Sequence, residues 1–279
     1  VCSSDLFPGD KRRTNRANYV APSSSVVTAL GKAGGAAVYE MQFRSPDVNA
    51  VYYNPDILYL PWRSASDPTT NMTASTFSGA LYDPNLSDTL DLSNITSVKR
   101  TWCRTYNVCA SETLSFNPAI VYRLTAGADP TKAASYTQYD LNDSANYAAA
   151  KSHANRTDCD ATGQGGKCTR AKERQNFANW FTYYRIRENM TKAALGRTLG
   201  EYQDKIRVGW AQFNAADNGV VTTSARIQRG IQPMNLAVLK QTLTDIYKIG
   251  SFSGTPTRTV LDEIGNYFKK TDKDSPWLT

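Results

Sequence analysis

The pattern of the sequence changes near residue 170, and this change constrains the fold more than any other feature. Upstream, turn signals such as Asn54-Pro55-Asp56 separate short apolar runs, at 37–39, 51–53, 57–60 and 119–122. Such runs are typical of short strands and irregular loops, because the residue before a proline is pushed out of the helical region. Residues 7–170 therefore predict a β-rich region, and residues 171–279 predict an α/β region.

A long amphipathic helix is predicted in the proline-free stretch 171–199. Phe177, Phe181 and Tyr184 fall there at i, i+4 and i+7, which places them on one face of a helix. Gly200 is the predicted end of this helix.

Strands and helices alternate in the rest of the α/β region. The mostly apolar run 206–213 predicts a strand buried on both faces rather than one in a surface hairpin, and 220–223 predicts a short strand. A helix that ends at Gly250 is predicted from the apolar positions Leu236, Leu239, Leu243 and Ile246. A last helix is predicted with Thr255 as N-cap and Pro256 in its first turn, and with one apolar side formed by Leu261, Ile264 and Phe268. This order is half of a doubly wound α/β domain, so the strands that complete its sheet are expected before residue 1 and after residue 279.

Four of the five cysteines form two local pairs. Cys103 lies close to Cys109, and Cys159 lies close to Cys168, without any Cys-x-x-Cys motif. This spacing disfavours zinc ribbons and thioredoxin-type redox sites and favours structural disulfides in an oxidising compartment, with free buried thiols as the alternative. Cys2 falls in residues 1–6, which look like a non-native leader.

Charge and composition exclude several functions. The formal charge of +7 is spread over the chain, and the basic cluster Lys11-Arg12-Arg13 is interpreted as a solvated loop, so no nucleic-acid partner is expected. No window approaches 18 uncharged apolar residues, so no membrane span is expected. His153 is the single histidine, which excludes zinc sites built on several histidines. It is expected on the surface, because no Gly-x-Ser-x-Gly motif could partner it.

Two segments carry groups that could bind a cation. Asp158, Asp160, Thr162 and Gly163 match four positions of a calcium-binding loop, but Thr169 stands where a bidentate glutamate is needed, and a disulfide-closed loop is preferred. Thr255 lies between Gly254 and Pro256 at a helix start, where its hydroxyl could coordinate a hard divalent cation at the ligand edge of a sheet. The alternative is that Thr255 only caps the helix.

Three blocks carry a family resemblance across residues 40–279. Residues 175–187, Gln-Asn-Phe-Ala-Asn-Trp-Phe-Thr-Tyr-Tyr-Arg-Ile-Arg, resemble a signature of the PilY/PilC type IV pilus tip proteins. Residues 51–62 resemble the Tyr-Asn-Pro segment of that family, and 254–258 with Leu261 resemble its Gly-Thr-Pro-x-Arg-x-x-Leu segment. Cys159 and Cys168 also fit.

The resemblance implies a fold. It implies a partial von Willebrand factor A-like (Rossmann-like) α/β domain, whose truncated core is 171–279 and whose large β-rich, disulfide-containing insertion is 7–170. In the family a metal-ion-dependent adhesion site holds Mg²⁺ or Ca²⁺ through an Asp-x-Ser-x-Ser motif, a threonine and a distal aspartate. Thr255 matches that threonine, and the other ligands are expected outside this sequence. The site is therefore expected to be incomplete here, with little or no metal affinity in this piece alone.

The resemblance also implies a function. It implies a non-enzymatic adhesin and pilus biogenesis module at the pilus tip or bacterial cell surface. Its implied partners are minor pilins, a host or abiotic surface, and a C-terminal calcium-binding β-propeller of the same chain. Two alternatives remain. One is a secreted hydrolase acting on surface glycan or protein, with paired carboxylates such as Asp88 and Asp91; the other is a purely structural assembly factor.

Overall fold

The fold is divided into two compact units. The computed structural model describes residues 25, 36–105, 108–152, 154–159, 167–213, 215–217, 220–222, 227–250, 257–273 and 275–277. Unit 1 comprises Val1–Trp62 and Met72–Ala193, and unit 2 comprises Arg63–Asn71 and Ala194–Thr279. The boundary falls within helix α4 (Arg187–Glu201), so it does not coincide with the change of pattern near residue 170. The leader 1–6 and the basic cluster at 11–13 lie outside the described residues.

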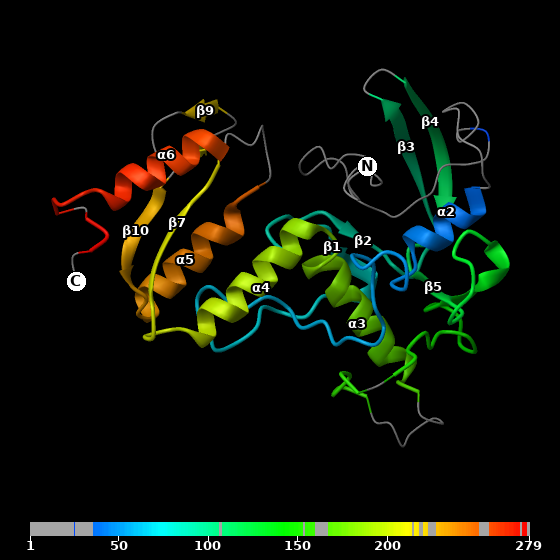
Figure 1. Ribbon diagram of the computed structural model, residues 1–279. Helices are drawn as coiled ribbons and strands as arrows, with labels where there is room; N and C mark the ends of the chain where they lie inside the picture. The colour runs from blue at the N-terminus through cyan, green and yellow to red at the C-terminus, as the bar shows by residue number, and fades with distance from the viewer. Residues whose placement is uncertain are drawn as a thin grey trace. The chain divides into compact units, whose positions relative to one another are not determined.

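In its described residues, unit 1 combines small antiparallel sheets with helices α2 and α3, the first part of α4, and long irregular segments (Figure 1). Its strands pair as β1 with β2, β3 with β4, and β5 with β6. The bounds of its elements are α2 (Ala36–Phe43), η2 (Phe77–Gly79), β1 (Ala80–Leu81), β2 (Thr89–Leu90), β3 (Thr96–Thr105), β4 (Val108–Phe116), β5 (Ile120–Leu124), η3 (Ala133–Ser135), β6 (Tyr136–Asp140) and α3 (Arg170–Tyr183). The apolar run 119–122 enters a strand as expected, whereas 37–39 is part of α2, and 51–53 and 57–60 are irregular.

The core of unit 1 is built around α3. Phe177 and Trp180 are buried on this helix, and rings from the irregular segments pack against them. The ring centroids of Tyr52 and Trp180 lie 4.9 Å apart, and those of Tyr53 and Phe177 also lie 4.9 Å apart, both in edge-on geometry. Such pairs each add about 0.5–1.5 kcal/mol beyond the burial of their area. The aromatic side chains of α3 therefore serve the core.

The predicted single helix at 171–199 is wrong, because the structure breaks it between α3 and α4. The break is stabilised by side chains that bind the last carbonyl groups of α3, which have no partner within the helix. Asn189 Nδ2 donates to the Thr182 carbonyl at 3.1 Å, and Trp62 Nε1 donates to the Tyr183 carbonyl at 2.8 Å. These donors come from outside α3, so helical periodicity contained no sign of the break.

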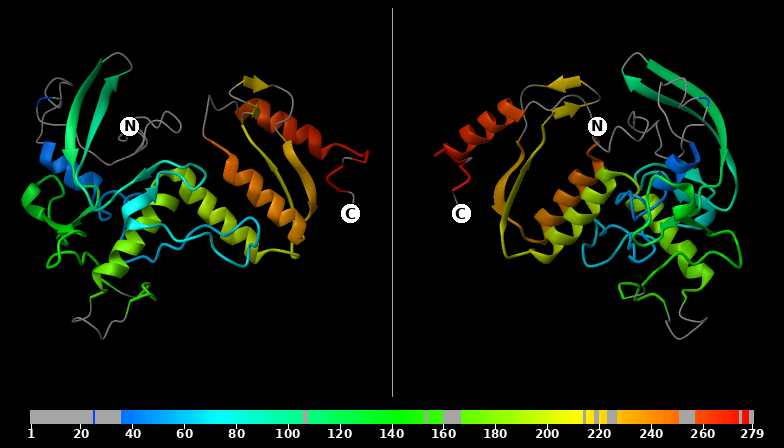
Figure 2. Two further views of the ribbon diagram at one scale, coloured as in Figure 1. Left: turned by 180° about the vertical axis from the view of Figure 1, so that it is seen from behind. Right: turned by 45° about the vertical axis from the view of Figure 1, so that its right-hand side comes forward.

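Unit 2 contains two antiparallel strand pairs and two helices (Figure 2). Strand β7 pairs with β10, and β8 pairs with β9. The bounds are β7 (Arg207–Ala211), β8 (Ala215–Asp217), β9 (Val220–Thr222), β10 (Ile227–Pro233), α5 (Leu236–Lys248) and α6 (Thr257–Phe268). The prediction of a strand buried on both faces at 206–213 is wrong, since β7 is only partly buried and Phe213 is 46% exposed. The short β8–β9 pair returns the chain beside β7, which produces the hairpin arrangement.

The two helices of unit 2 differ in how well periodicity predicted them. Helix α5 is confirmed, with Leu239, Leu243 and Ile246 buried, but Leu236 of the predicted apolar face is 42% exposed. The side chain of the N-cap residue Asn235 accepts a hydrogen bond from the Val238 amide. Helix α6 is present, but its predicted apolar side faces outward, with Leu261 63% and Phe268 40% exposed. Among the described residues, no helix has both the length and the apolar character needed to cross a membrane.

Candidate functional site

The signature helix α3 holds an irregular part of the chain through its amide side chains. Asn176 Oδ1 accepts a hydrogen bond from the Tyr59 amide at 2.7 Å, and its Nδ2 donates to the Ile57 carbonyl at 2.8 Å. Asn179 Oδ1 accepts from the Ser75 amide at 3.0 Å, and its Nδ2 donates to the Tyr59 carbonyl at 2.9 Å. Both asparagines are buried. Their side chains give the buried backbone amide and carbonyl groups the hydrogen-bond partners that a neighbouring strand would otherwise supply.

Aromatic side chains of α3 and its C-cap continue this pattern. Trp180 Nε1 donates to the Val51 carbonyl at 3.3 Å. Tyr183 Oη donates to the Thr73 carbonyl at 2.7 Å, and Tyr184 Oη donates to the Leu60 carbonyl at 2.6 Å. We call this set of α3 side chains the helix clamp: Asn176, Asn179, Trp180, Tyr183 and Tyr184. The helix clamp thus holds backbone groups that lie outside the named strands, at Val51, Ile57, Tyr59, Leu60, Thr73 and Ser75.

Sequence reasoning treated this block as a family signature and missed its structural role. One available signal was the pair of asparagines inside a helical pattern, because asparagine is a poor helix former that usually binds backbone groups. Asn176 and Asn179 are three residues apart, so they lie on neighbouring parts of one face. The signature residues therefore hold segments of unit 1 together.

A buried ionic cluster lies at the start of α3. Arg156 and Glu173 are each 1% exposed, and Arg156 Nη1 lies 3.3 Å from both carboxylate oxygens of Glu173. Tyr53 Oη donates to Glu173 Oε2 at 3.2 Å. Burial raises the pKa of Glu173, while the charge of Arg156 acts in the opposite direction. Burial also raises the pKa of the Tyr53 hydroxyl. Because each polar group has a partner, the cluster is suited to joining segments.

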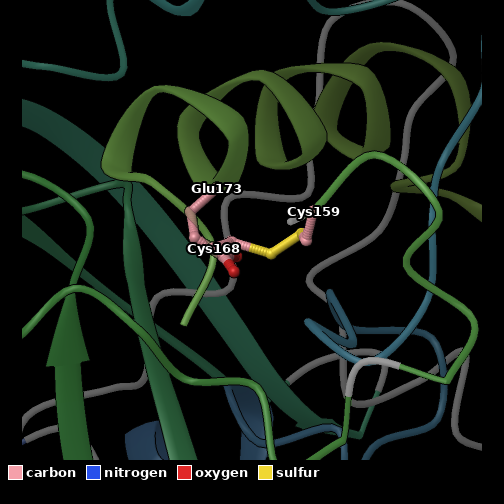
Figure 3. Close-up of side chains that lie close together, drawn as sticks. All are labelled: Cys159, Cys168 and Glu173. Carbon is pink, nitrogen blue, oxygen red and sulfur yellow. A yellow bond between two sulfur atoms is a disulfide. The ribbon is translucent and has the colours of Figure 1, made fainter. Parts of the chain in front are cut away.

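The disulfide Cys159–Cys168 closes the loop beside this cluster (Figure 3). Its sulfur atoms and a carboxylate oxygen of Glu173 lie within 4.8 Å of one another, and this is the one group of possible metal ligands among the described residues. The group does not fit a metal ion, because thiolates bind metals and these sulfurs are bonded to each other. The Cα atoms of the two cysteines are 5.0 Å apart.

The other predicted site residues fall in different places. Thr255 and His153 lie outside the described residues, as do Asp160, Thr162 and Gly163 of the calcium-loop pattern. The remaining carboxylate of that pattern, Asp158, is bound to Arg156 at 2.8 and 3.0 Å. In the β3–β4 ladder Cys103 stands directly opposite Cys109, and Cys109 is disulfide-bonded.

Asp91, which the hydrolase alternative would use, closes a turn. It accepts hydrogen bonds from the Ser93 amide at 2.8 Å and from Asn94 Nδ2 at 2.6 Å. The side-chain and backbone hydrogen bonds of Ser93 lower the pKa of Asp91. A general acid in a hydrolase needs a raised pKa, so the environment of Asp91 is unsuited to that role.

A second ionic network joins three irregular segments of unit 1. Arg123 on β5 lies 3.1 Å from Asp47 and 3.0 Å from Asp56. Asp47 also binds Lys151 Nζ at 3.1 Å, and Asp56 accepts from the amides of Lys151 and Ser152 at 2.6 and 2.9 Å. Both carboxylates are therefore engaged in cross-links between segments.

Comparison with known proteins finds similarity to one class of protein, the factors of type IV pilus biogenesis. The chain is 24% identical over 110 residues to the type IV pilus biogenesis factor PilY1 of Pseudomonas aeruginosa strain PAO1, and the match covers 38% of this chain and 10% of that protein. It is 26% identical over 116 residues to PilY1 of strain PAK, covering 38% of this chain and 9% of that protein.

The matches cover only a small part of the relatives: the chain spans about a tenth of the length of the curated proteins it matches. No protein-family model matches the sequence, and no solved structure matches it. The similarity supports a role related to type IV pili.

Proposed function

We propose that the chain is part of a non-enzymatic surface protein that acts in type IV pilus biogenesis and in attachment. The observation that carries this proposal is the similarity to two type IV pilus biogenesis factors. The engagement of Glu173, Asp47, Asp56 and Asp91 in structural hydrogen bonds and ion pairs supports the non-enzymatic part. In this proposal the protein acts outside the cell, at the pilus tip or the bacterial surface.

The proposed attachment site is a metal-ion-dependent adhesion site of a von Willebrand factor A-like domain, of which 171–279 is part. Thr255 would contribute one oxygen ligand to Mg²⁺ or Ca²⁺, and the remaining ligands would come from parts of the protein outside this sequence. Support comes from the Gly-Thr-Pro sequence that precedes α6. A carboxylate of the partner could then occupy an open coordination position of the ion.

The proposed partners are minor pilins at the pilus tip, a host or abiotic surface, and a C-terminal β-propeller of the full-length protein. Support for these partners comes from the similarity to two type IV pilus biogenesis factors.

Gene deletion with complementation tests the assembly and attachment roles separately. Loss of pili after deletion supports an assembly role, and normal piliation with lost attachment supports adhesion. If deletion changes neither pilus number nor attachment to surfaces, the proposal is refuted. If pilus number falls but attachment per pilus is normal, the protein is a structural assembly factor only.

The metal site is tested by Thr255→Ala in the full-length protein, with Thr259→Ala as the matched control because Thr259 is exposed on α6. Thr255→Ala is expected to weaken Mg²⁺ or Ca²⁺ binding and to reduce attachment, whereas Thr259→Ala leaves both unchanged. Unchanged cation binding and attachment in Thr255→Ala would show that Thr255 is only a helix cap.

A further inference from the structure

A groove in unit 2 lies between strand β10 and helix α6. Its volume is about 620 Å³, which is within the usual size of binding sites in proteins. β10 contributes Ile227, Gly230 and Ile231 to one wall. The other wall is formed by Glu263 and Tyr267 of α6 and by Lys270, which follows the end of α6 at Phe268. The groove is therefore partly apolar, with charged groups along the wall formed by α6 and the residues after it.

The backbone of β10 presents a donor to this groove. The pairing of β10 with β7 is irregular between Arg229 and Gln232. At this irregularity the Ile231 amide donates to Tyr267 Oη at 2.7 Å, so its N–H group points at α6. Gly230 allows this approach, because a Cβ atom there would lie 3.0 Å from Tyr267 Oη. The hydroxyl of Tyr267 thus occupies the position that a carbonyl of a further strand would take.

The charges on this wall follow an order along the chain. Glu263 lies on α6, whereas Lys270 follows the last residue of α6, Phe268. Lys273 adds a second cation beyond Lys270. An extended segment that runs along the groove meets an acidic group first and basic groups last. In such a segment, side chains four residues apart share one face and are separated by about 13 Å, so two opposite charges on it can face this wall at separate points.

We propose that the groove receives an extended segment of a partner protein, which adds to the edge of β10 and replaces the Tyr267 hydroxyl as acceptor for the Ile231 amide. The segment carries a basic residue that faces Glu263 and an acidic residue, four positions away, that faces Lys270 and Lys273. Main-chain hydrogen bonds then provide affinity and the charge order provides selectivity. A second copy of β10 is a poor occupant, since its sequence contains Arg229 but no acidic residue.

This inference goes beyond the proposed role in pilus biogenesis and does not depend on it, because all its groups lie in unit 2 and none is a proposed metal ligand.

The first test measures binding of a fluorescent eight-residue peptide to the whole chain. The peptide alternates valine and threonine and carries a lysine and a glutamate four positions apart. Lys270→Glu is expected to weaken binding about three- to tenfold, since exposed charge pairs contribute modestly. Lys269→Glu is the matched control, because Lys269 is exposed and is not among the residues of the groove wall. It is expected to change affinity by less than about twofold.

Two modified peptides separate strand addition from simple charge attraction. Each is N-methylated at one of the two alternating sets of amides and keeps both charges. If the peptide pairs with β10, the affinity of one of the two N-methylated peptides must fall at least about tenfold, because only one set of amides faces the strand.

Hydrogen exchange at Ile231 completes the test. Tyr267→Phe removes the acceptor of the Ile231 amide and should accelerate its exchange in the free protein, and bound peptide should restore protection. The proposal is overturned if the peptide fails to bind, if both N-methylated peptides bind like the parent, if Lys269→Glu and Lys270→Glu have equal effects, or if binding leaves Ile231 unprotected. The groove would then be no more than a covered strand edge.

Discussion

Replacing Asn176 by leucine tests whether the helix clamp holds unit 1 together. The substitution removes an acceptor for the Tyr59 amide and a donor for the Ile57 carbonyl, at 2.7 and 2.8 Å. Tyr53 Oη also loses the Asn176 Nδ2 donor at 3.0 Å but keeps its bond to Glu173. The Tyr59 amide stays buried without a partner, which costs about 1–3 kcal/mol. The Ile57 carbonyl is only part-buried, so the loss of its hydrogen bond costs about 0.5–1.5 kcal/mol.

We therefore expect Asn176→Leu to lower the free energy of unfolding by about 1–4 kcal/mol, after a small gain from the better helix propensity of leucine. This is a large part of the total stability of about 5–15 kcal/mol that is typical of a domain. Urea unfolding followed by tryptophan fluorescence measures the difference, since Trp180 lies in the core of unit 1.

Lys172→Leu is the control on the same helix, because Lys172 is exposed, and it should change stability by no more than about 0.5 kcal/mol. If Asn176→Leu destabilises the protein no more than Lys172→Leu does, the hydrogen bonds of the helix clamp do not stabilise unit 1. A variant that fails to fold at all, beside a folded control, agrees with the expectation.

Three further predictions concern stability. Gly196→Ala places a Cβ atom against Tyr247 Oη and should cost about 1–3 kcal/mol by overpacking; Tyr247→Phe should relieve part of this loss in the double variant, and purely additive losses in urea unfolding would contradict the contact. Replacing Cys159 and Cys168 by serine should lower the free energy of unfolding by about 2–3 kcal/mol, because their separation of nine residues gives a short closed loop; unchanged urea midpoints would contradict this. Burial raises the pKa of Tyr59 from 10.0 to about 12, so its hydroxyl stays protonated in the folded protein while it ionises in the unfolded chain. Burial raises the pKa of Tyr53, Tyr122 and Tyr183 as well. Stability is therefore fully present below pH 10 and should fall by at least about 1.4 kcal/mol per pH unit between pH 10 and 12; a flat profile in that window, measured by urea unfolding, would contradict the burial of Tyr59.

Patterns within one element were predicted well from the sequence. Helix α5 follows from the spacing of Leu239 and Leu243, since these residues make a buried stripe whatever they pack against. The disulfide Cys159–Cys168 joins two residues only nine apart, so local spacing was sufficient to suggest it.

The candidate site was less predictable, because its groups come from distant parts of the chain. Glu173 meets Arg156 and Tyr53, which are separated from it by 17 and 120 residues. The same applies to Tyr267 and Ile231, which are separated by 36 residues. No periodicity relates such positions, so the ionic cluster and the groove were absent from the sequence-based predictions.

The amino-acid sequence by itself determined the local preferences of this protein: where helices such as α5 begin, which residues are apolar along them, and which cysteines are near neighbours. Only the tertiary structure decided that the helical stretch breaks after Tyr183, that β7 pairs in a hairpin, and that α6 turns Tyr267 rather than Leu261 toward β10. The physical reason is that buried carbonyl and amide groups must find partners. Those partners are side chains and strands brought together by folding, and they outweigh the weaker preferences of each segment.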